Sequence, residues 1–220
     1  DNIPEGGCLL VVNHSLATYD IAMLSHAVFD KLGRMPRGLG DKRVFQVPGL
    51  ASLARYFGAV VASHEQADRL LSDGLIVLVA PGGMKEALRP SEERYEVRWE
   101  ERRGFVRLAI RTGVPIVLAA CPAADDLFDV APSSLTDRLY RDYHVPLPML
   151  RGLKSLASLV PKAVALTHVI GEPIAPPKLG EECSDADTEA AVVALHDEVL
   201  ERMSTLMTRG LELADDAASR

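Results

Sequence analysis

Short, wholly apolar runs of residues punctuate this chain and predict the strands of a central sheet. A strand that is covered on both faces has no polar alternation, so it reads as a continuous apolar run bounded by glycine, proline or asparagine. The predicted strands are residues 8–12, 59–62, 75–80, 115–120 and 163–170.

Between these runs, apolar positions recur every three or four residues, which is the period of a helix with one buried face. Ser63 followed by Gln66 has the spacing of a capping box, and it predicts a helix that begins after Ser63 and stops before Gly74. The other predicted helices are residues 20–30, residues 105–112 and a long amphipathic helix over residues 185–215.

This alternation predicts an α/β fold with a largely parallel central sheet flanked by helices. No internal repeat or low-complexity linker divides the sequence, so we expect residues 1–220 to form a single domain. Within that domain, residues 128–162 break the regular alternation and are interpreted as an amphipathic insertion. Residues 185–215 are expected to close the domain as a C-terminal helix.

The composition narrows the class of protein. Hydrophobic residues make up 48% of the 220 positions, which excludes a disordered chain. The net charge of −7 argues against binding of nucleic acid, because such surfaces are usually basic. The three cysteines form no C-x-x-C pair, which excludes a zinc ribbon and fits reduced thiols in the cytoplasm.

No apolar run approaches the roughly 18–20 residues that span a bilayer, and no secretory signal is visible. The sequence begins at Asp1 rather than at methionine. We therefore expect that an upstream segment was removed or left out, and the sequence leaves open whether that segment held a membrane anchor.

A histidine and an aspartate follow the first predicted strand, at the edge where open α/β sheets bind ligands. On one helix, His14 and Asp20 would lie about 240° apart, so only a loop can bring the carboxylate to the imidazole. A carboxylate on one ring nitrogen would leave the other nitrogen to accept a proton from a hydroxyl. The plainer interpretation is a polar histidine at a strand end and an unrelated aspartate at the start of a helix.

Two glycines follow the strand over residues 75–80. Gly82 and Gly83 would let a ligand approach the backbone closely, and free N–H groups there would hold an anion or a developing oxyanion. Lys85 and Glu86 add charge to the same turn. The plainer interpretation is a tight turn in which glycine serves conformation alone. No Walker-type or G-x-G-x-x-G motif is present, so nucleotide binding by those routes has no support.

Taken in order, these segments resemble the glycerolipid acyltransferase superfamily over roughly residues 5–175, and most closely its branch related to the type 2 diacylglycerol acyltransferases. The similar blocks are Asn13-His14 with Asp20, residues 40–48 with 57–63, residues 79–86, residues 95–110 and residues 114–118. Each block alone is weak evidence for this superfamily, whereas the order of the blocks and the separations between them are specific to it.

The resemblance implies direct transfer of an acyl chain from an acyl thioester, either acyl-CoA or acyl-carrier protein, to a hydroxyl. His14 would act as general base, Asp20 would orient the imidazole and stabilise its charged form, and the Gly82–Gly83 turn would supply oxyanion N–H groups. No metal or cofactor is implied. The positions implied to bind substrate are Asn13, Gly82, Gly83, Lys85 and Glu86.

The sequence departs from the superfamily at two places. Five residues rather than four separate His14 from Asp20, and the block Phe-Pro-Glu-Gly-Thr-Arg has Gly82 and Lys85 where the superfamily has the Glu and Arg implicated in binding glycerol phosphate. Lysine lacks the planar fork with which arginine binds phosphate. We therefore expect an uncharged lipid acceptor, such as diacylglycerol or a lipid alcohol.

Other functions stay open on the sequence. One is a 1-acylglycerol-3-phosphate acyltransferase of phospholipid biosynthesis, with Lys85 at the phosphate. Another is a catalytically silent module that binds lipid or acyl chains, and a third is transfer to an acceptor that is not a lipid.

A leucine-rich stretch over residues 135–160 is the candidate for membrane contact. Residues 128–162 carry a net charge of +2 in a chain of −7, which suits a segment at the surface of a bilayer. The plainer interpretation is a helix that faces the core. On the first interpretation the protein is cytoplasmic and lies at the inner face of the membrane.

Overall fold

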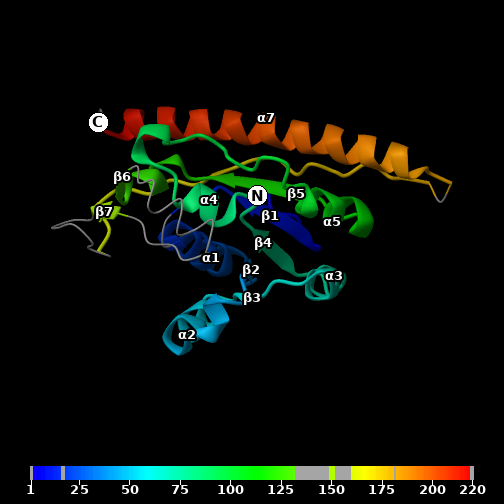
Figure 1. The fold of residues 1–220 in the computed structure, drawn as a ribbon, viewed down its shortest axis with the longest axis horizontal. Helices are drawn as coiled ribbons and strands as arrows, with labels where there is room; N and C mark the ends of the chain where they lie inside the picture. The colour runs from blue at the N-terminus through cyan, green and yellow to red at the C-terminus, as the bar shows by residue number, and fades with distance from the viewer. Residues whose placement is uncertain (1, 16–17, 132–148, 152–159, 181, 219–220) are drawn as a thin grey trace.

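The apolar runs pair into a central sheet in the computed structural model, which describes residues 2–15, 18–131, 149–151, 160–180 and 182–218. Within these residues six strands form one sheet in the order β3-β2-β4-β1-β5-β8 (Figure 1), all parallel except β8, which pairs antiparallel with β5. The strands are β1 (Cys8–Val12), β2 (Arg37–Gly40), β3 (Val60–Val61), β4 (Ile76–Val79), β5 (Ile116–Ala120) and β8 (Val169–Ile170). The predicted α/β class is confirmed.

Side chains alternate between the two faces of the central strand β1 and build a separate core on each side. Leu9 and Val11 join one hydrophobic cluster, whereas Cys8, Leu10 and Val12 join the other. Because both faces of β1 are covered, its five residues are all buried, and this explains the unbroken apolar run in the sequence.

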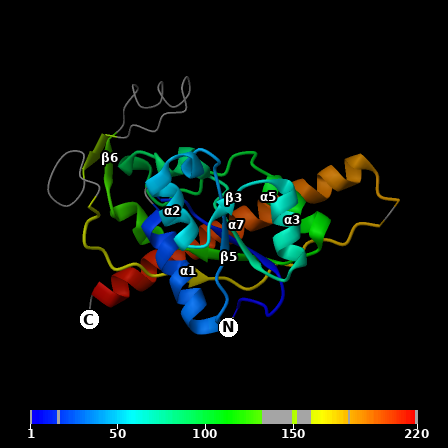
Figure 2. The same ribbon diagram turned by 90° about the horizontal axis from the view of Figure 1, so that it is seen from below.

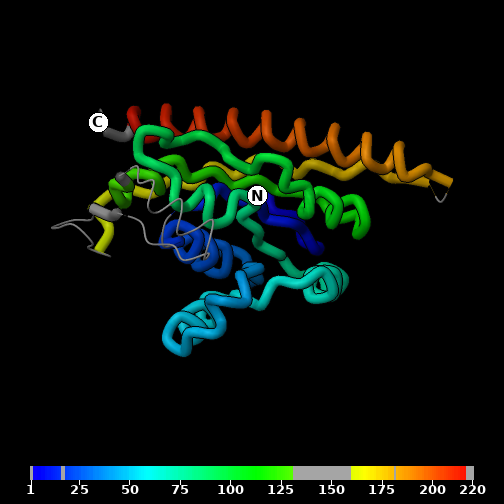
Figure 3. The backbone as a smooth tube through the Cα atoms, viewed as in Figure 1, coloured from blue at the N-terminus to red at the C-terminus, as the bar shows by residue number. Residues whose placement is uncertain are grey.

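The helices cover both faces of the sheet. Figures 1 and 2 show the long helix α7 and the helix α1 on opposite sides of the strands, and Figure 3 shows α7 running along one whole side of the molecule. The helices are α1 (Tyr19–Leu32), α2 (Pro48–Tyr56), α3 (His64–Ser72), α4 (Gly83–Ala87), α5 (Gly104–Thr112) and α7 (Asp185–Ala218). Short 3₁₀ turns are η2 (Val44–Gln46), η3 (Ser91–Glu93) and η4 (Pro122–Asp126).

Local capping explains where two of the predicted helices begin and end. The Ser63 hydroxyl accepts a hydrogen bond from the Gln66 N–H at 3.0 Å and caps α3. Gly113 takes a left-handed conformation at the end of α5, where a side chain would be strained.

The strand prediction fails at two places, one strand being too long and another missed. Of residues 163–170, only Val169 and Ile170 form a strand, at the edge of the sheet. Strand β2 has no apolar run, because its sequence Arg-Gly-Leu-Gly is only half-buried, yet it pairs between β3 and β4.

The segment over residues 128–162 lies mostly outside the described residues. Its described parts include a small antiparallel pair of strands, β6 (Asp129–Ala131) and β7 (Met149–Arg151). The proposed contact through residues 135–160 therefore stays a prediction from the sequence. No helix among the described residues is long and apolar enough to cross a bilayer.

The parallel pairing aligns the carboxyl ends of β1, β2, β4 and β5 along one edge of the sheet. The segments that leave this edge begin at Asn13, Asp41, Ala80 and Cys121. We call it the catalytic edge, because it collects the chemistry-bearing residues described next.

Candidate active site

A side-chain clamp fixes the chain where β1 ends. The Asn13 side-chain amide donates to the Cys121 carbonyl at 3.1 Å, and its oxygen accepts from the Cys121 N–H at 2.8 Å. These two bonds join the ends of β1 and β5, which are 108 residues apart in sequence. Asn13 is buried with both polar atoms of its side chain in use, so it positions the next residue rather than binding substrate as the resemblance implied.

His14 follows directly and is partly exposed at the catalytic edge. Its backbone N–H donates to the Glu86 Oε2 at 3.0 Å, and its Nδ1 lies 2.8 Å from the Ser15 carbonyl oxygen. A carbonyl only accepts, so this bond assigns the proton to Nδ1 and leaves Nε2 with a lone pair. Burial lowers the pKa of His14. The hydrogen bond to Ser15 raises it, whereas the positive charges of Arg89 and Arg102 lower it further, so the ring stays neutral and able to take a proton.

Asp20 reaches His14 indirectly. It is buried in the first turn of α1, and its Oδ1 accepts a hydrogen bond from the Ser15 hydroxyl. Among the described residues, no hydrogen bond or ion pair joins the Asp20 carboxylate to the imidazole. The predicted direct dyad is replaced by a chain in which the side chain of Ser15 meets Asp20 and its carbonyl meets His14.

Burial and hydrogen bonding also decide what Ser15 and Asp20 can do chemically. The buried Ser15 hydroxyl is committed to Asp20, which disfavours it as a nucleophile. Burial raises the pKa of Asp20 to about 6, although hydrogen bonds from the Ser15 side chain and from the backbone at Asp20 and Ile21 oppose the shift.

Glu86 lies beneath His14 rather than in contact with solvent. It is 1% exposed, and its carboxylate accepts from the backbone N–H groups of His14 and, at 3.4 Å, of Arg98. The structure therefore makes Glu86 a positioning residue for the His14 backbone, where the resemblance implied a substrate contact. Gly82 is required here, because a Cβ at this position would collide with the Glu86 side chain.

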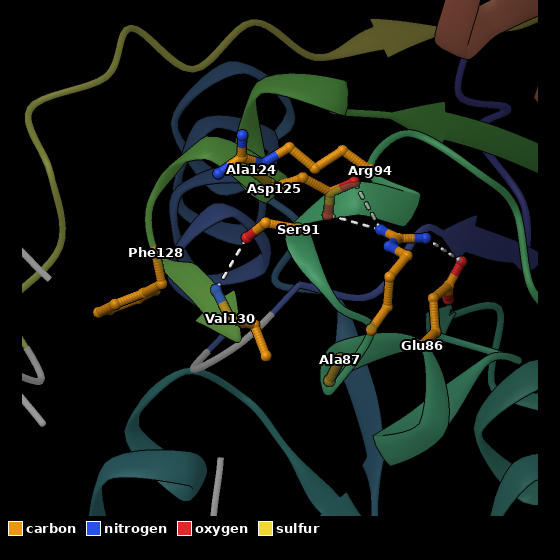
Figure 4. Close-up of a pocket in the computed structure, with 9 residues that line it drawn as sticks. Glu86, Ala87, Ser91, Arg94, Ala124, Asp125, Phe128 and Val130 are labelled. Atoms are coloured by element: carbon orange, nitrogen blue, oxygen red, sulfur yellow. Dashed lines mark hydrogen bonds and ion pairs between the residues drawn. The ribbon is translucent and has the colours of Figure 1, made fainter. Parts of the chain in front are cut away.

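A buried arginine links this carboxylate to a second one. The Arg89 guanidinium binds both oxygens of Asp125 at 2.5 and 2.6 Å and lies 3.9 Å from the Glu86 Oε1. Figure 4 shows the carboxylates of Glu86 and Asp125 turned towards one another, and the dashed lines between them mark the hydrogen bonds and the ion pair of Arg89. We call these three residues the buried ion network.

Burial dominates the ionisation of the buried ion network. It raises the pKa of Glu86 to about 7, with Arg89 and the backbone N–H groups of Arg98 and His14 opposing it. Burial raises the pKa of Asp125 as well, again against the effect of Arg89. The single arginine thus limits the cost of two buried carboxylates.

The turn after β4 is held by a second arginine. The Arg102 Nη1 donates to the carbonyls of Pro81 and Gly82 at 2.9 and 2.6 Å. Gly83 has a φ of +51°, and a Cβ there would lie 2.7 Å from the Arg102 Nη1, so glycine is needed for both conformation and space. The Gly83 N–H donates to the Ala80 carbonyl at 3.1 Å, so one of the two N–H groups expected to hold an oxyanion is already bonded.

Lys85 is exposed at the surface of α4. Its Nζ lies 3.1 Å from the Glu100 carboxylate, and both side chains are more than half exposed. The cation expected to bind substrate is therefore neutralised at the surface by a neighbouring acid.

The structure thus places Asp20 and Glu86 on either side of the residues that follow β1, Asp20 bonded to Ser15 and Glu86 to the His14 backbone. The contacts of Asn13 and Glu86 are those of positioning residues. Sequence reasoning missed Arg89, Arg102 and Asp125. Arg89 and Asp125 lie outside the motif blocks, and Arg102 lies in the block over residues 95–110, to which the resemblance gave no role in the site. Tertiary contacts bring all three to the site.

Comparisons with known proteins find a family model and several relatives of this chain. Residues 1–121 match the model of a protein family described as Acyltransferase. No solved structure gives a significant match.

Relatives of this chain occur in animals and bacteria. It is 31% identical over 200 residues to the mouse protein named "DGAT1/2-independent enzyme synthesizing storage lipids", covering 90% of this chain and 58% of the relative. The human protein of that name is 30% identical, with 96% of this chain and 64% of the relative covered. An uncharacterized protein of Mycobacterium tuberculosis is 32% identical over 95% of this chain and 59% of its own length. The chain therefore spans about three fifths of the length of the curated relatives it matches.

Proposed function

The chain belongs to the Acyltransferase family, and from that premise we propose that it transfers a fatty acyl chain from an acyl thioester to the hydroxyl of an uncharged lipid. One observation carries the proposal. The Nδ1 of His14 bonds to the Ser15 carbonyl, so Nε2 is left as a proton acceptor at the catalytic edge. A neutral imidazole in one fixed tautomer suits general base catalysis.

In the proposed reaction, the His14 Nε2 takes the proton of the acceptor hydroxyl while the oxygen attacks the thioester carbonyl. The C–S bond then breaks, and the departing thiolate of CoA or of the acyl-carrier protein takes the proton back from the imidazolium. The Asp20 carboxylate acts through Ser15, since the Ser15 side chain and carbonyl join it to the ring. No covalent acyl-enzyme is needed.

Two observations favour an uncharged acceptor such as diacylglycerol. Lys85 is paired with Glu100 at the surface, so it has no unopposed charge to offer a phosphate. Relatives that match most of this chain carry the name of an enzyme that synthesizes storage lipids.

A phosphorylated acceptor is the second candidate, and Arg102 is the observation that favours it. The guanidinium of Arg102 is close enough to His14 to contribute to lowering the pKa of the imidazole. The Nη1 of Arg102 makes both of the bonds to the carbonyls of Pro81 and Gly82. The Nη2 and Nε of the same guanidinium therefore offer donors for an anion.

An acceptor panel tests the proposed function. The chain is mixed with oleoyl-CoA and, separately, with diacylglycerol, monoacylglycerol, a fatty alcohol or lysophosphatidate, and release of the CoA thiol is followed. We expect release that depends on the acceptor, fastest with diacylglycerol or the fatty alcohol. Fastest release with lysophosphatidate would establish the second candidate instead.

The pH dependence of kcat/KM follows from the two central groups. His14 has a lowered pKa and is neutral at neutral pH, whereas Asp20 takes a proton as the pH falls through about 6. We expect a rate that is constant above neutral pH and declines as the pH falls through about 6, where Asp20 loses its charge. In Asp20→Asn that decline should move to lower pH, because only His14 then titrates. A decline centred well above neutral pH would contradict this assignment.

A further inference from the structure

Helix α2 and the turn before it expose a row of large apolar side chains. Every third residue from η2 to the end of α2 is apolar, and these side chains are between 37% and 78% exposed. We call this row the apolar ridge; it consists of Val44, Val47, Leu50, Leu53 and Tyr56. Only Ala51 is buried in α2, so the helix does not use its larger apolar side chains for packing. Large apolar side chains exposed so near one another in sequence usually mark an interaction surface.

Basic side chains accompany the ridge. From position 41 to position 56 the chain has Lys42, Arg43 and Arg55 against the single acid Asp41, a net charge of +2 in a chain of −7. All three bases are exposed. Apolar side chains with cations around them are the combination that holds an amphipathic helix at the surface of an anionic bilayer.

The ridge also lies on the side of the sheet that the reaction uses. Strand β2 runs parallel to β4, and β4 to β1, so the turn that leaves the carboxyl end of β2 is at the catalytic edge with His14. Neighbouring strands are about 4.8 Å apart, which places the ends of β2 and β1 about 10 Å from one another. Figure 1 shows α2 projecting beyond α1 and away from α7, as a helix must if it is to enter a lipid surface.

We propose that the apolar ridge, with Lys42, Arg43 and Arg55, docks this protein on an anionic lipid surface and turns the catalytic edge towards the bilayer. The reason for docking rests on the proposed function, since a lipid acceptor resides in the membrane. The docking itself depends only on the exposed apolar side chains and the local positive charge.

Vesicle flotation tests the proposal. The chain is mixed with vesicles of phosphatidylcholine alone or of phosphatidylcholine with phosphatidylglycerol, and the bound fraction is measured at low and high salt. We expect binding to the anionic vesicles that weakens with salt, and weaker binding to the neutral ones. Leu50→Ser with Leu53→Ser should weaken binding to anionic vesicles at least tenfold.

Charge variants separate the electrostatic part of the docking from the apolar part. Lys42→Gln with Arg43→Gln should weaken binding to anionic vesicles by about fivefold for each charge removed, the equivalent of about 1 kcal/mol each. Binding to neutral vesicles should change little.

Matched controls come from α7, on the other side of the sheet. Leu213→Ser removes an exposed leucine outside the apolar ridge, and Arg202→Gln removes an exposed arginine away from it, so neither should change flotation. Because every substituted residue is exposed, all variants should keep the thermal unfolding midpoint of the wild type.

Three results would overturn the proposal. These are an unchanged bound fraction in the Leu50→Ser/Leu53→Ser variant, no flotation of the wild type with anionic vesicles, and self-association of the wild type in solution that this variant abolishes while vesicle binding persists. Flotation requires no turnover. A chain that floats as expected but transfers no acyl group would therefore support docking and contradict the proposed function.

Discussion

Replacing His14 with alanine is expected to lower acyl transfer by about 10²–10⁴-fold, the range that general base catalysis contributes. The bond from its Nδ1 to the Ser15 carbonyl leaves the Nε2 of this imidazole as a proton-accepting nitrogen at the catalytic edge. The measurement is the rate of acceptor-dependent release of CoA from oleoyl-CoA, with purified variant and wild type at equal concentration.

His26→Ala is the matched control, because His26 is an exposed histidine on α1 and should leave the rate unchanged. The backbone bond from His14 to Glu86 survives in the alanine variant, so its free energy of unfolding should stay close to that of the wild type. Full activity of the His14→Ala variant would contradict the proposed mechanism.

Replacing Arg89 with methionine is expected to destabilise the protein by about 3–5 kcal/mol, the usual cost of removing one partner from a buried ion pair. The arginine is 5% exposed and serves both carboxylates of the buried ion network, so its loss leaves Glu86 and Asp125 without a counter-charge. The free energy of unfolding in urea measures the effect.

The pH dependence of this loss has a definite sign. Glu86 already has a pKa of about 7 against an ordinary value of 4.5, so the folded state keeps the proton to a higher pH than the unfolded chain does. Without Arg89 the pKa values of both carboxyl groups rise further, and folding then favours protonation more strongly. The destabilisation should therefore be largest above neutral pH and shrink as the pH falls through about 7.

Arg202→Met provides the control, because the Arg202–Glu198 pair is half exposed and its loss should change stability by at most about 1 kcal/mol. Equal stability of the Arg89→Met variant and the wild type at alkaline pH would show that Arg89 does not stabilise the buried carboxylates of Glu86 and Asp125. Since Glu86 holds the His14 backbone, the destabilised variant should also have a lower rate of acyl transfer.

The hydrophobic periodicity of the sequence was sufficient to predict the strands and helices whose own apolar side chains pack in the core. Strands β1, β4 and β5 and helix α7 fall where apolar runs or helical spacing predict them. Strand β2 could not be predicted this way, because its two glycines contribute no apolar side chain and its place is set by pairing with β3 and β4. Helix α2 could not be predicted from burial either, since most of its large apolar side chains are exposed.

For the candidate site, the sequence located the loop but not its bonds. His14 and Asp20 follow β1 as predicted, whereas the link through Ser15 depends on which way a peptide carbonyl points, a feature that residue spacing does not encode. The clamp between Asn13 and Cys121 joins residues far apart in sequence. The resemblance implied a substrate contact for Glu86, whereas in the structure its side chain is buried and accepts a hydrogen bond from the His14 backbone N–H.

The central claim is that this chain esterifies an uncharged lipid hydroxyl, and a competition within one set of vesicles tests it most directly. Diacylglycerol and lysophosphatidate are offered in equal amounts with labelled oleoyl-CoA, and the ratio of labelled triacylglycerol to labelled phosphatidate gives the ratio of the two kcat/KM values. The account predicts that labelled triacylglycerol predominates with the wild type and that both products disappear with His14→Ala. Predominant phosphatidate, or labelled triacylglycerol at the wild-type rate from His14→Ala, would contradict it.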